Sequence, residues 1–181
     1  MKLNRFKLIA ALSVTFALAP AMAHEAHTHG IGKLDVAIEG ATLSLHLDTP
    51  LANLVGFEHA ARSDKDKKAL RQMVAALNNA EALFVTTPAA ECHVISTKLK
   101  SSVLDEMEAK STRKKTGQPK NAHADMDADY AFNCTHPEQL NDIDVKLFST
   151  FGRFHQIDVQ VVTPKRQSSR KLLPNRSRIS W

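Results

Sequence analysis

The sequence predicts an α+β fold with a mainly antiparallel β-sheet, one main helix and a flexible charged insert. Three observations lead to this prediction. Apolar and polar residues alternate with period two in several segments, apolar residues recur at helical spacing in one segment, and one stretch is rich in lysine and poor in apolar residues. Several strands combined with one substantial helix are typical of an α+β protein built around antiparallel sheet.

A hairpin of two half-buried strands is predicted over residues 33–48. Apolar side chains alternate with mainly polar ones on both sides of a turn at Gly40-Ala41, and Pro50 ends the second strand. Such alternation around a tight turn indicates a β-hairpin. The alternating apolar residues are Leu34, Val36, Ile38, Leu43, Leu45 and Leu47.

One long helix is predicted after an irregular stretch that runs through Gly56. Ser63 and Asp66 have the spacing of a helix-start box, and Asn78-Asn79 is expected to end the helix. Between them, apolar residues recur at i, i+3, i+4 and i+7, the spacing of one helix face. These residues are Leu70, Met73, Val74 and Leu77.

Further strands are predicted where β-branched residues or period two return. They cover residues 92–99, 126–134, 143–148, 157–162 and 168–173. Residues 101–122 differ, because they contain several lysines together with Gly117 and Pro119 and few apolar residues in their second half. We expect a solvated, flexible insert there, with a short helical turn over Leu104–Lys110.

Residues 1–23 are predicted to be a secretory signal peptide. Basic residues precede a short apolar run, and Ala21-Met22-Ala23 forms an A-x-A cleavage site. The apolar run, Leu8 to Ala19, is shorter than the ~20 residues that a membrane-spanning helix needs. We therefore expect export, cleavage before His24 and a single domain over residues 24–181, rather than an integral membrane protein.

The two cysteines, Cys92 and Cys134, are an even number in a protein predicted to be exported. A disulfide between them is the first interpretation, because disulfides persist in oxidising compartments. Two buried thiols or a thiolate metal site are the alternatives that the residues leave open. The spacing does not match the C-x-x-C motif of redox enzymes.

Charge and motifs exclude two broad classes of function. Loss of the three basic residues of the signal peptide lowers the net charge of +5 to about +2, and no basic stripe alternates with aromatic residues. We therefore expect no nucleic-acid partner. The sequence also lacks the H-E-x-x-H, G-x-S-x-G and Gly-rich phosphate-loop motifs, so we do not expect an enzyme.

The predicted mature N-terminus is rich in histidine. His24, His27 and His29 fall within six residues, in the segment H-E-A-H-T-H-G. Neutral imidazole is the commonest ligand for zinc, copper and nickel, and a mobile segment brings it to a metal with little strain. The alternative is a solvated terminus that binds nothing.

Two further groups combine imidazole with carboxylates. Glu58 and His59 are adjacent on the loop before the main helix, so both could approach one ion, although either could be a plain surface group. His123 begins a segment in which acidic residues alternate along one strand face, where neighbouring pairs could share a metal. The acidic residues are Asp125, Asp127 and Asp129. They are equally consistent with the solvent-exposed face of a half-buried strand.

The remaining histidines are less informative. His46 lies on the polar face of the second hairpin strand and allows either interpretation. We expect structural or surface roles for His93, His136 and His155.

Four segments, in order along nearly the whole predicted mature chain, resemble the ZrgA-like family of bacterial periplasmic proteins of zinc acquisition. The segments are H-T-H-G-I-G-K-L-D-V-A-I-E-G, P-L-A-N-L-V-G-F-E-H-A, H-A-D-M-D-A-D-Y-A-F-N-C and R-I-S-W. The resemblance implies zinc binding in the periplasm and cooperation with a zinc ABC importer and its solute-binding protein. It also supports pairing of Cys92 with Cys134.

Carried over to this sequence, the resemblance implies a set of zinc ligands. They are His27, His29, Glu58, His59 and His123, to which the histidine-rich start adds His24. Such proteins often have a long histidine- and acid-rich tract between the cysteines, whereas the insert here is rich in lysine. We therefore expect one or two zinc sites rather than a high capacity.

The sequence as a whole predicts a periplasmic zinc-binding protein that buffers zinc or delivers it to the importer, without bond-making chemistry. The same ligands would bind nickel or copper, so the assignment to zinc depends on the resemblance. The rival hypotheses are a metal-independent interaction module of the cell envelope and a metallohydrolase with an open zinc site.

Overall fold

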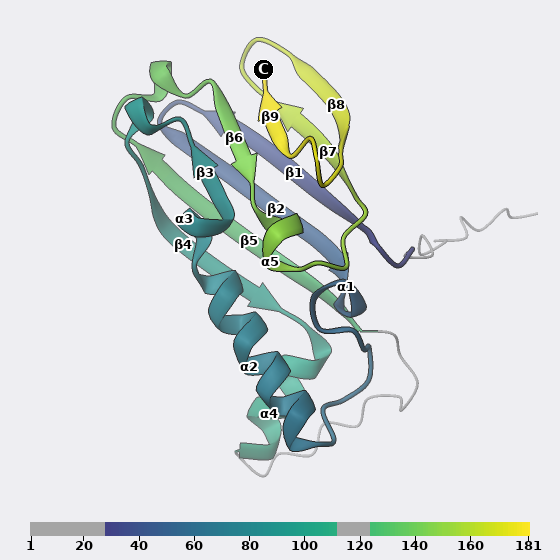
Figure 1. The fold of residues 1–181 in the computed structure, drawn as a ribbon. Coiled ribbons are helices and arrows are strands. Elements are labelled where there is room, and N and C mark those ends of the chain that lie inside the picture. The colour runs from purple at the N-terminus through teal and green to yellow at the C-terminus, as the bar shows by residue number, and fades with distance from the viewer. Residues whose placement is uncertain (1–27, 112–123) are drawn as a thin grey trace, which may run out of the picture.

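The computed structural model describes residues 28–111 and 124–181. The predicted signal peptide, His24, His27, His123 and the second part of the predicted insert lie outside these residues. Within the described residues, six strands form a sheet in the order β4-β5-β2-β1-β7-β8, and three form a smaller sheet in the order β3-β6-β9 (Figure 1). The α+β class with mainly antiparallel pairing is confirmed.

The elements of the large sheet are β1 (Ile31–Glu39), β2 (Thr42–Pro50), β4 (Cys92–Lys100), β5 (Asp125–Cys134), β7 (Gln156–Val162) and β8 (Gln167–Leu172). The small sheet consists of β3 (Phe84–Thr86), β6 (Asp142–Val145) and β9 (Arg178–Ser180). The helices are α1 (Leu51–Val55), α2 (Asp64–Asn78), α3 (Ala80–Leu83), α4 (Ser102–Ser111) and α5 (Leu147–Thr150), with short 3₁₀ turns η1 (Pro88–Ala90) and η2 (Pro137–Gln139).

The predicted hairpin is present as β1 and β2. Glu39 pairs with Thr42 across a turn of two residues, and Gly40 takes a φ of 57° there, a left-handed conformation that glycine adopts without a steric penalty. The predicted alternation is found in the burial, because Leu34, Leu43 and their apolar partners are buried while the residues between them are exposed or half-buried. Ile38, near the turn, is half-buried and packs against the core.

The main helix, α2, begins and ends where the sequence predicts. The Ser63 side chain accepts a hydrogen bond from the backbone N–H of Asp66, and the Asp66 carboxylate accepts one from the backbone N–H of Ser63. This reciprocal capping satisfies two N–H groups that a helix start otherwise leaves unpaired. Leu70, Met73 and Leu77 are buried, which fixes the face that α2 turns to the sheet.

The core lies on one side of the large sheet. Figure 1 shows α2 and the small sheet in front of the large sheet. Buried residues of the large sheet, including Leu45, Phe132 and Val159, form one hydrophobic cluster with residues of α2 and the small sheet. The other side of the large sheet presents polar residues, because successive side chains of a strand point to opposite faces. That polar side therefore has an ordered array of charged groups.

The predicted disulfide is confirmed. Cys92 is directly opposite Cys134 in the pairing of β4 with β5, and the two sulfur atoms are bonded. No free cysteine exists, since the chain has only these two. The bond ties the edge strand β4 to its neighbour, and it excludes both buried thiols and a thiolate metal site.

Two local predictions were wrong. The stretch before Gly56 was expected to be irregular, but it contains α1. The strand expected over residues 143–148 stops at Val145, and α5 follows, because Leu147 and Phe148 are both buried and adjacent strand residues cannot share a face. The short helical turn predicted over Leu104–Lys110 is present within α4, which is longer than expected.

Three further elements, α3, β3 and β9, are not predicted from the sequence, and all of them are short. No helix among the described residues is long and apolar enough to span a membrane.

Candidate metal-binding sites

His29 and Glu58, two of the ligands predicted from the sequence, are in contact. His29 lies with Gly30 in the turn that leads into β1, and Glu58 lies on the loop after α1. His29 Nε2 is 2.8 Å from Glu58 Oε1. Because a carboxylate only accepts hydrogen bonds, Nε2 carries the proton in this contact and Nδ1 is left for another partner. The Glu58 side chain is 14% exposed and that of His29 is 69% exposed. Solvent therefore reaches the pair mainly on the side of the imidazole.

The buried amide of Asn53, on α1, positions the His29 segment. The backbone N–H of Gly30 donates to Asn53 Oδ1 at 2.6 Å, and Asn53 Nδ2 donates to the carbonyl of Ile31 and to Thr49 Oγ1, both at 2.9 Å. Asn53 is only 1% exposed. Buried amides of this kind are costly unless every polar atom is paired, and here the pairing fixes the backbone next to His29.

Gly30 is required at the same turn. Its φ is 84°, and a side chain at this position would collide with the ring of His155. The carbonyl of Gly30 accepts hydrogen bonds from the backbone N–H of His155 and Gln156. His155 therefore covers Gly30 and lies close to the His29 segment, although the sequence analysis assigned it no binding role.

Gly56 gives the Glu58 loop its direction. It ends α1 with a φ of 87°, and its backbone N–H donates to the carbonyl of Ala52. A side-chain carbon at Gly56 would lie 2.7 Å from Nη2 of Arg153, so the guanidinium covers this residue. The chain then turns back, and Glu58 meets His29.

His59, the third predicted ligand within the described residues, has different partners. Its Nδ1 donates to the carbonyl of Ala60 at 2.9 Å, and its ring stacks on Phe57 with centroids 4.8 Å apart. In the neutral ring, this hydrogen bond leaves the lone pair on Nε2 of His59. Among residues 28–111 and 124–181, no three histidine, cysteine or carboxylate side chains converge as a ready metal site. The structure thus brings two predicted ligands together but no complete set.

The acidic face of β5 contains a second contact between histidine and carboxylate. Asp129 Oδ1 is 2.7 Å from Nδ1 of His46 on β2, its direct partner across the strands. The sequence analysis proposed that neighbouring aspartates of β5 share a metal and left His46 undecided. The two residues are 83 positions apart, so only the pairing of β2 with β5 reveals their contact.

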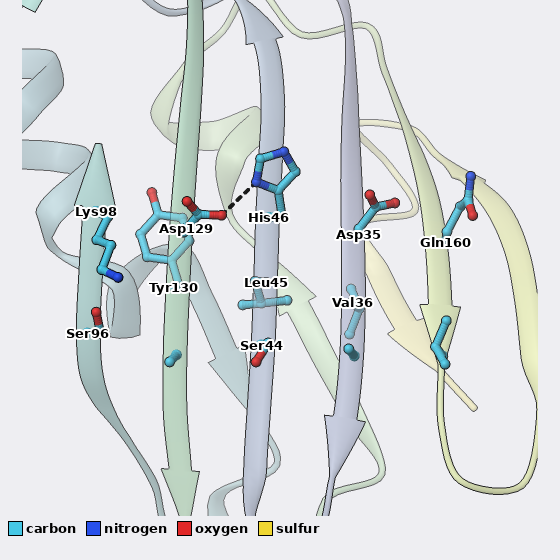
Figure 2. Close-up of a pocket in the computed structure, with 13 residues that line it drawn as sticks. Asp35, Val36, Ser44, Leu45, His46, Ser96, Lys98, Asp129, Tyr130 and Gln160 are labelled. Atoms are coloured by element: carbon cyan, nitrogen blue, oxygen red, sulfur yellow. Dashed lines mark hydrogen bonds and ion pairs between the residues drawn. The ribbon is translucent and has the colours of Figure 1, made fainter. Parts of the chain in front are cut away.

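His46 lies in a shallow depression on the polar side of the large sheet (Figure 2). The depression has a volume of about 530 Å³, and its polar lining includes Asp35, Lys98 and Gln160. In register across the sheet, the order is Lys98, Asp129, His46, Asp35 and Gln160. Figure 2 shows the imidazole between Asp129 on one side and Asp35 on the other.

Comparison with known proteins identifies one family. The family model described as ZrgA family zinc uptake protein matches residues 26–181. The matched range includes both residues of the His29–Glu58 pair, both cysteines and the polar side of the sheet. No curated protein matches the chain.

Proposed function

Because this chain belongs to the ZrgA family of zinc uptake proteins, we propose that it binds zinc in the periplasm and buffers it for, or delivers it to, an ABC-type zinc importer and its solute-binding protein. The single observation that carries the proposal is the 2.8 Å contact between His29 Nε2 and Glu58 Oε1. The disulfide between Cys92 and Cys134 supports export to an oxidising compartment. The role is one of binding, without catalysis.

The His29–Glu58 pair suits zinc on chemical grounds. Zinc binds imidazole nitrogen and carboxylate oxygen at about 2.0–2.2 Å in tetrahedral sites, which places two ligand atoms about 3.3 Å apart. The two atoms therefore need to separate by only about half an ångström when zinc replaces the shared proton. The exposed imidazole of His29 has the freedom to make this movement, while the largely buried Glu58 provides a fixed anchor.

Two ligands leave half of a tetrahedral site open. His24 and His27 are five and two residues upstream of His29, respectively, so we propose that this segment fills the open positions. His59, adjacent to Glu58, uses Nδ1 for its hydrogen bond to the carbonyl of Ala60, so Nε2 of the neutral ring is a further candidate ligand. Ligands from a terminal segment can be exchanged one at a time, which suits a protein that releases its zinc to a partner. The role of His123 stays a prediction from the sequence.

Melting temperature with and without zinc tests the proposal. Zinc at ~100 times its dissociation constant stabilises a folded protein by roughly 2.7 kcal/mol, which raises the melting temperature of a protein of this size by about 5–10 °C. We expect this increase in the wild type and its loss in Glu58→Gln and His29→Ala. Metal analysis of the protein isolated from the periplasm distinguishes zinc from nickel and copper.

A matched control is the exposed pair of His136 and Glu138, whose side chains approach within 3.7 Å. We expect Glu138→Gln and His136→Ala to keep the full effect of zinc. If Glu58→Gln and His29→Ala also keep it, the pair is not the zinc site. If zinc does not stabilise the wild type, the proposed zinc binding is wrong.

A further inference from the structure

The hydrogen bond of His46 fixes which of its nitrogen atoms is available to a metal. Because the carboxylate of Asp129 only accepts, the proton of a neutral His46 ring is on Nδ1, and Nε2 keeps its lone pair. Histidine ligands of metals usually donate their other ring N–H to a carboxylate or carbonyl, which orients the ring and raises its basicity. His46 and Asp129 have this arrangement.

Asp35 lies on the other side of the same imidazole. It is directly opposite His46 in the pairing of β1 with β2, and its side chain points to the same face. Side chains at directly opposite positions have Cβ atoms about 5 Å apart, so the Asp35 carboxylate can approach Nε2 through a change of rotamer. No hydrogen bond or ion pair occupies Asp35 among the described residues, whereas Asp129 is bonded to His46.

The space beside these two side chains is open and has room for an ion with its water. The depression of about 530 Å³ borders Asp35 and His46. A second depression, of about 630 Å³, borders the same two residues and extends to Lys33, Asp48 and Asp158. Both open to solvent on the polar side of the sheet, where a hydrated cation can enter and leave.

The surrounding charges leave Asp35 as the carboxylate available to a cation. Lys98 is directly opposite Asp129, and Lys33 is directly opposite Asp48 on one side and Asp158 on the other. The second direct neighbour of Asp35 is Gln160, which is neutral. The lysines of this face are thus aligned with other carboxylates.

We propose that His46 Nε2 and the carboxylate of Asp35 form a second site for zinc, with Asp129 as the residue that positions the imidazole. Water fills the other coordination positions, so the site exchanges its metal readily. This second site goes beyond the proposed function, and none of its ligands belongs to the His29–Glu58 pair. Asp35 lies about 13 Å along β1 from Ile31, where the His29 segment enters the sheet.

Nuclear magnetic resonance of the histidine ring nitrogens tests this site in the wild-type protein. Addition of zinc chloride is expected to shift the Nε2 resonance of His46 in a saturable manner. Asp35→Asn is expected to weaken this binding at least tenfold while the melting temperature without zinc stays unchanged. Asp48→Asn, which changes a carboxylate of the same face outside the site, is the matched control and is expected to bind as the wild type does.

Glu58→Gln separates this proposal from the first. The resonances of His46 should still respond to zinc in Glu58→Gln, although most of the zinc-dependent stabilisation is lost there. Two results would overturn the second site: a His46 resonance that does not move with zinc in the wild type, or equal zinc affinity at His46 in Asp35→Asn and the wild type. Neither result affects the test of the His29–Glu58 pair.

Discussion

Asn53 connects the core to the His29–Glu58 pair through individual hydrogen bonds. Its amide oxygen accepts from the backbone of Gly30, the residue after His29, and its amide nitrogen donates to the backbone of Ile31. The positive φ angles of Gly30 and Gly56 allow the two segments of the pair to meet. The positions of His29 and Glu58 therefore depend on a buried side chain and on backbone conformations that do not touch a metal.

Asn53→Ala should lower both stability and zinc affinity. The substitution leaves the buried N–H of Gly30 and the carbonyl of Ile31 without their partner, and each such loss costs about 1–3 kcal/mol. We expect a decrease of at least about 2 kcal/mol in the free energy of unfolding in urea. The control is Asn141→Ala, because Asn141 is exposed and, among the described residues, its side chain donates only to the carbonyl of Gln139. Equal stability of Asn53→Ala and the wild type would contradict the positioning role of Asn53.

Tyr130 should make the stability of the folded protein decrease at alkaline pH. Burial raises the pKa of its phenol well above the usual value, and its hydroxyl has no hydrogen-bond partner among the described residues. The folded state therefore retains a proton that the unfolded state loses near pH ~10. Stability is fully present below that pH and decreases as the pH rises above it, by up to ~1.4 kcal/mol per pH unit.

Tyr130 is the only tyrosine, so the ultraviolet absorbance of phenolate reports on this residue alone. We expect the native protein to show no phenolate until it unfolds, whereas the chain in urea titrates near pH ~10. Tyr130→Phe should remove the alkaline loss of stability and should cost little at neutral pH, because the hydroxyl makes no bond that is lost. Native protein that ionises near pH ~10 without unfolding would show that Tyr130 is not buried.

At the level of helices and strands, the sequence predicts the elements that are encoded by a pattern of neighbouring residues. The hairpin of β1 and β2 follows from alternation around Gly40, and α2 follows from the Ser63 box and its apolar spacing. The parallel pairing of β1 with β7 joins segments more than a hundred residues apart, and no local period encodes it. Short elements such as α5 are also missed, because four residues are too few to display a helical period.

The disulfide between β4 and β5 closes a long loop and should contribute strongly to stability. The two cysteines are 42 residues apart, for which loss of chain entropy in the unfolded state predicts about 4 kcal/mol. We expect the double substitution Cys92→Ala and Cys134→Ala to lower the free energy of unfolding by about 2–4 kcal/mol. Mass spectrometry after alkylation without reductant should find no labelled thiol in the native protein. Two labelled cysteines would contradict the bond.

At the scale of the whole molecule, the large sheet has one face for the core and one for polar chemistry. The sequence predicts His29 and Glu58 as separate candidates, but they are 29 residues apart and only the fold places them in contact. His46 and Asp129 meet in the same way, through strand order rather than spacing. Local patterns therefore identify residue types suited to zinc, and the topology determines which of them meet.

The most direct test of the central claim is anomalous scattering at the zinc absorption edge from crystals grown with zinc. We predict a zinc peak at about 2.0–2.2 Å from a ring nitrogen of His29 and from a carboxylate oxygen of Glu58. Crystals that contain zinc only elsewhere, or that take up none, with His29 and Glu58 still hydrogen-bonded to each other, would contradict the account.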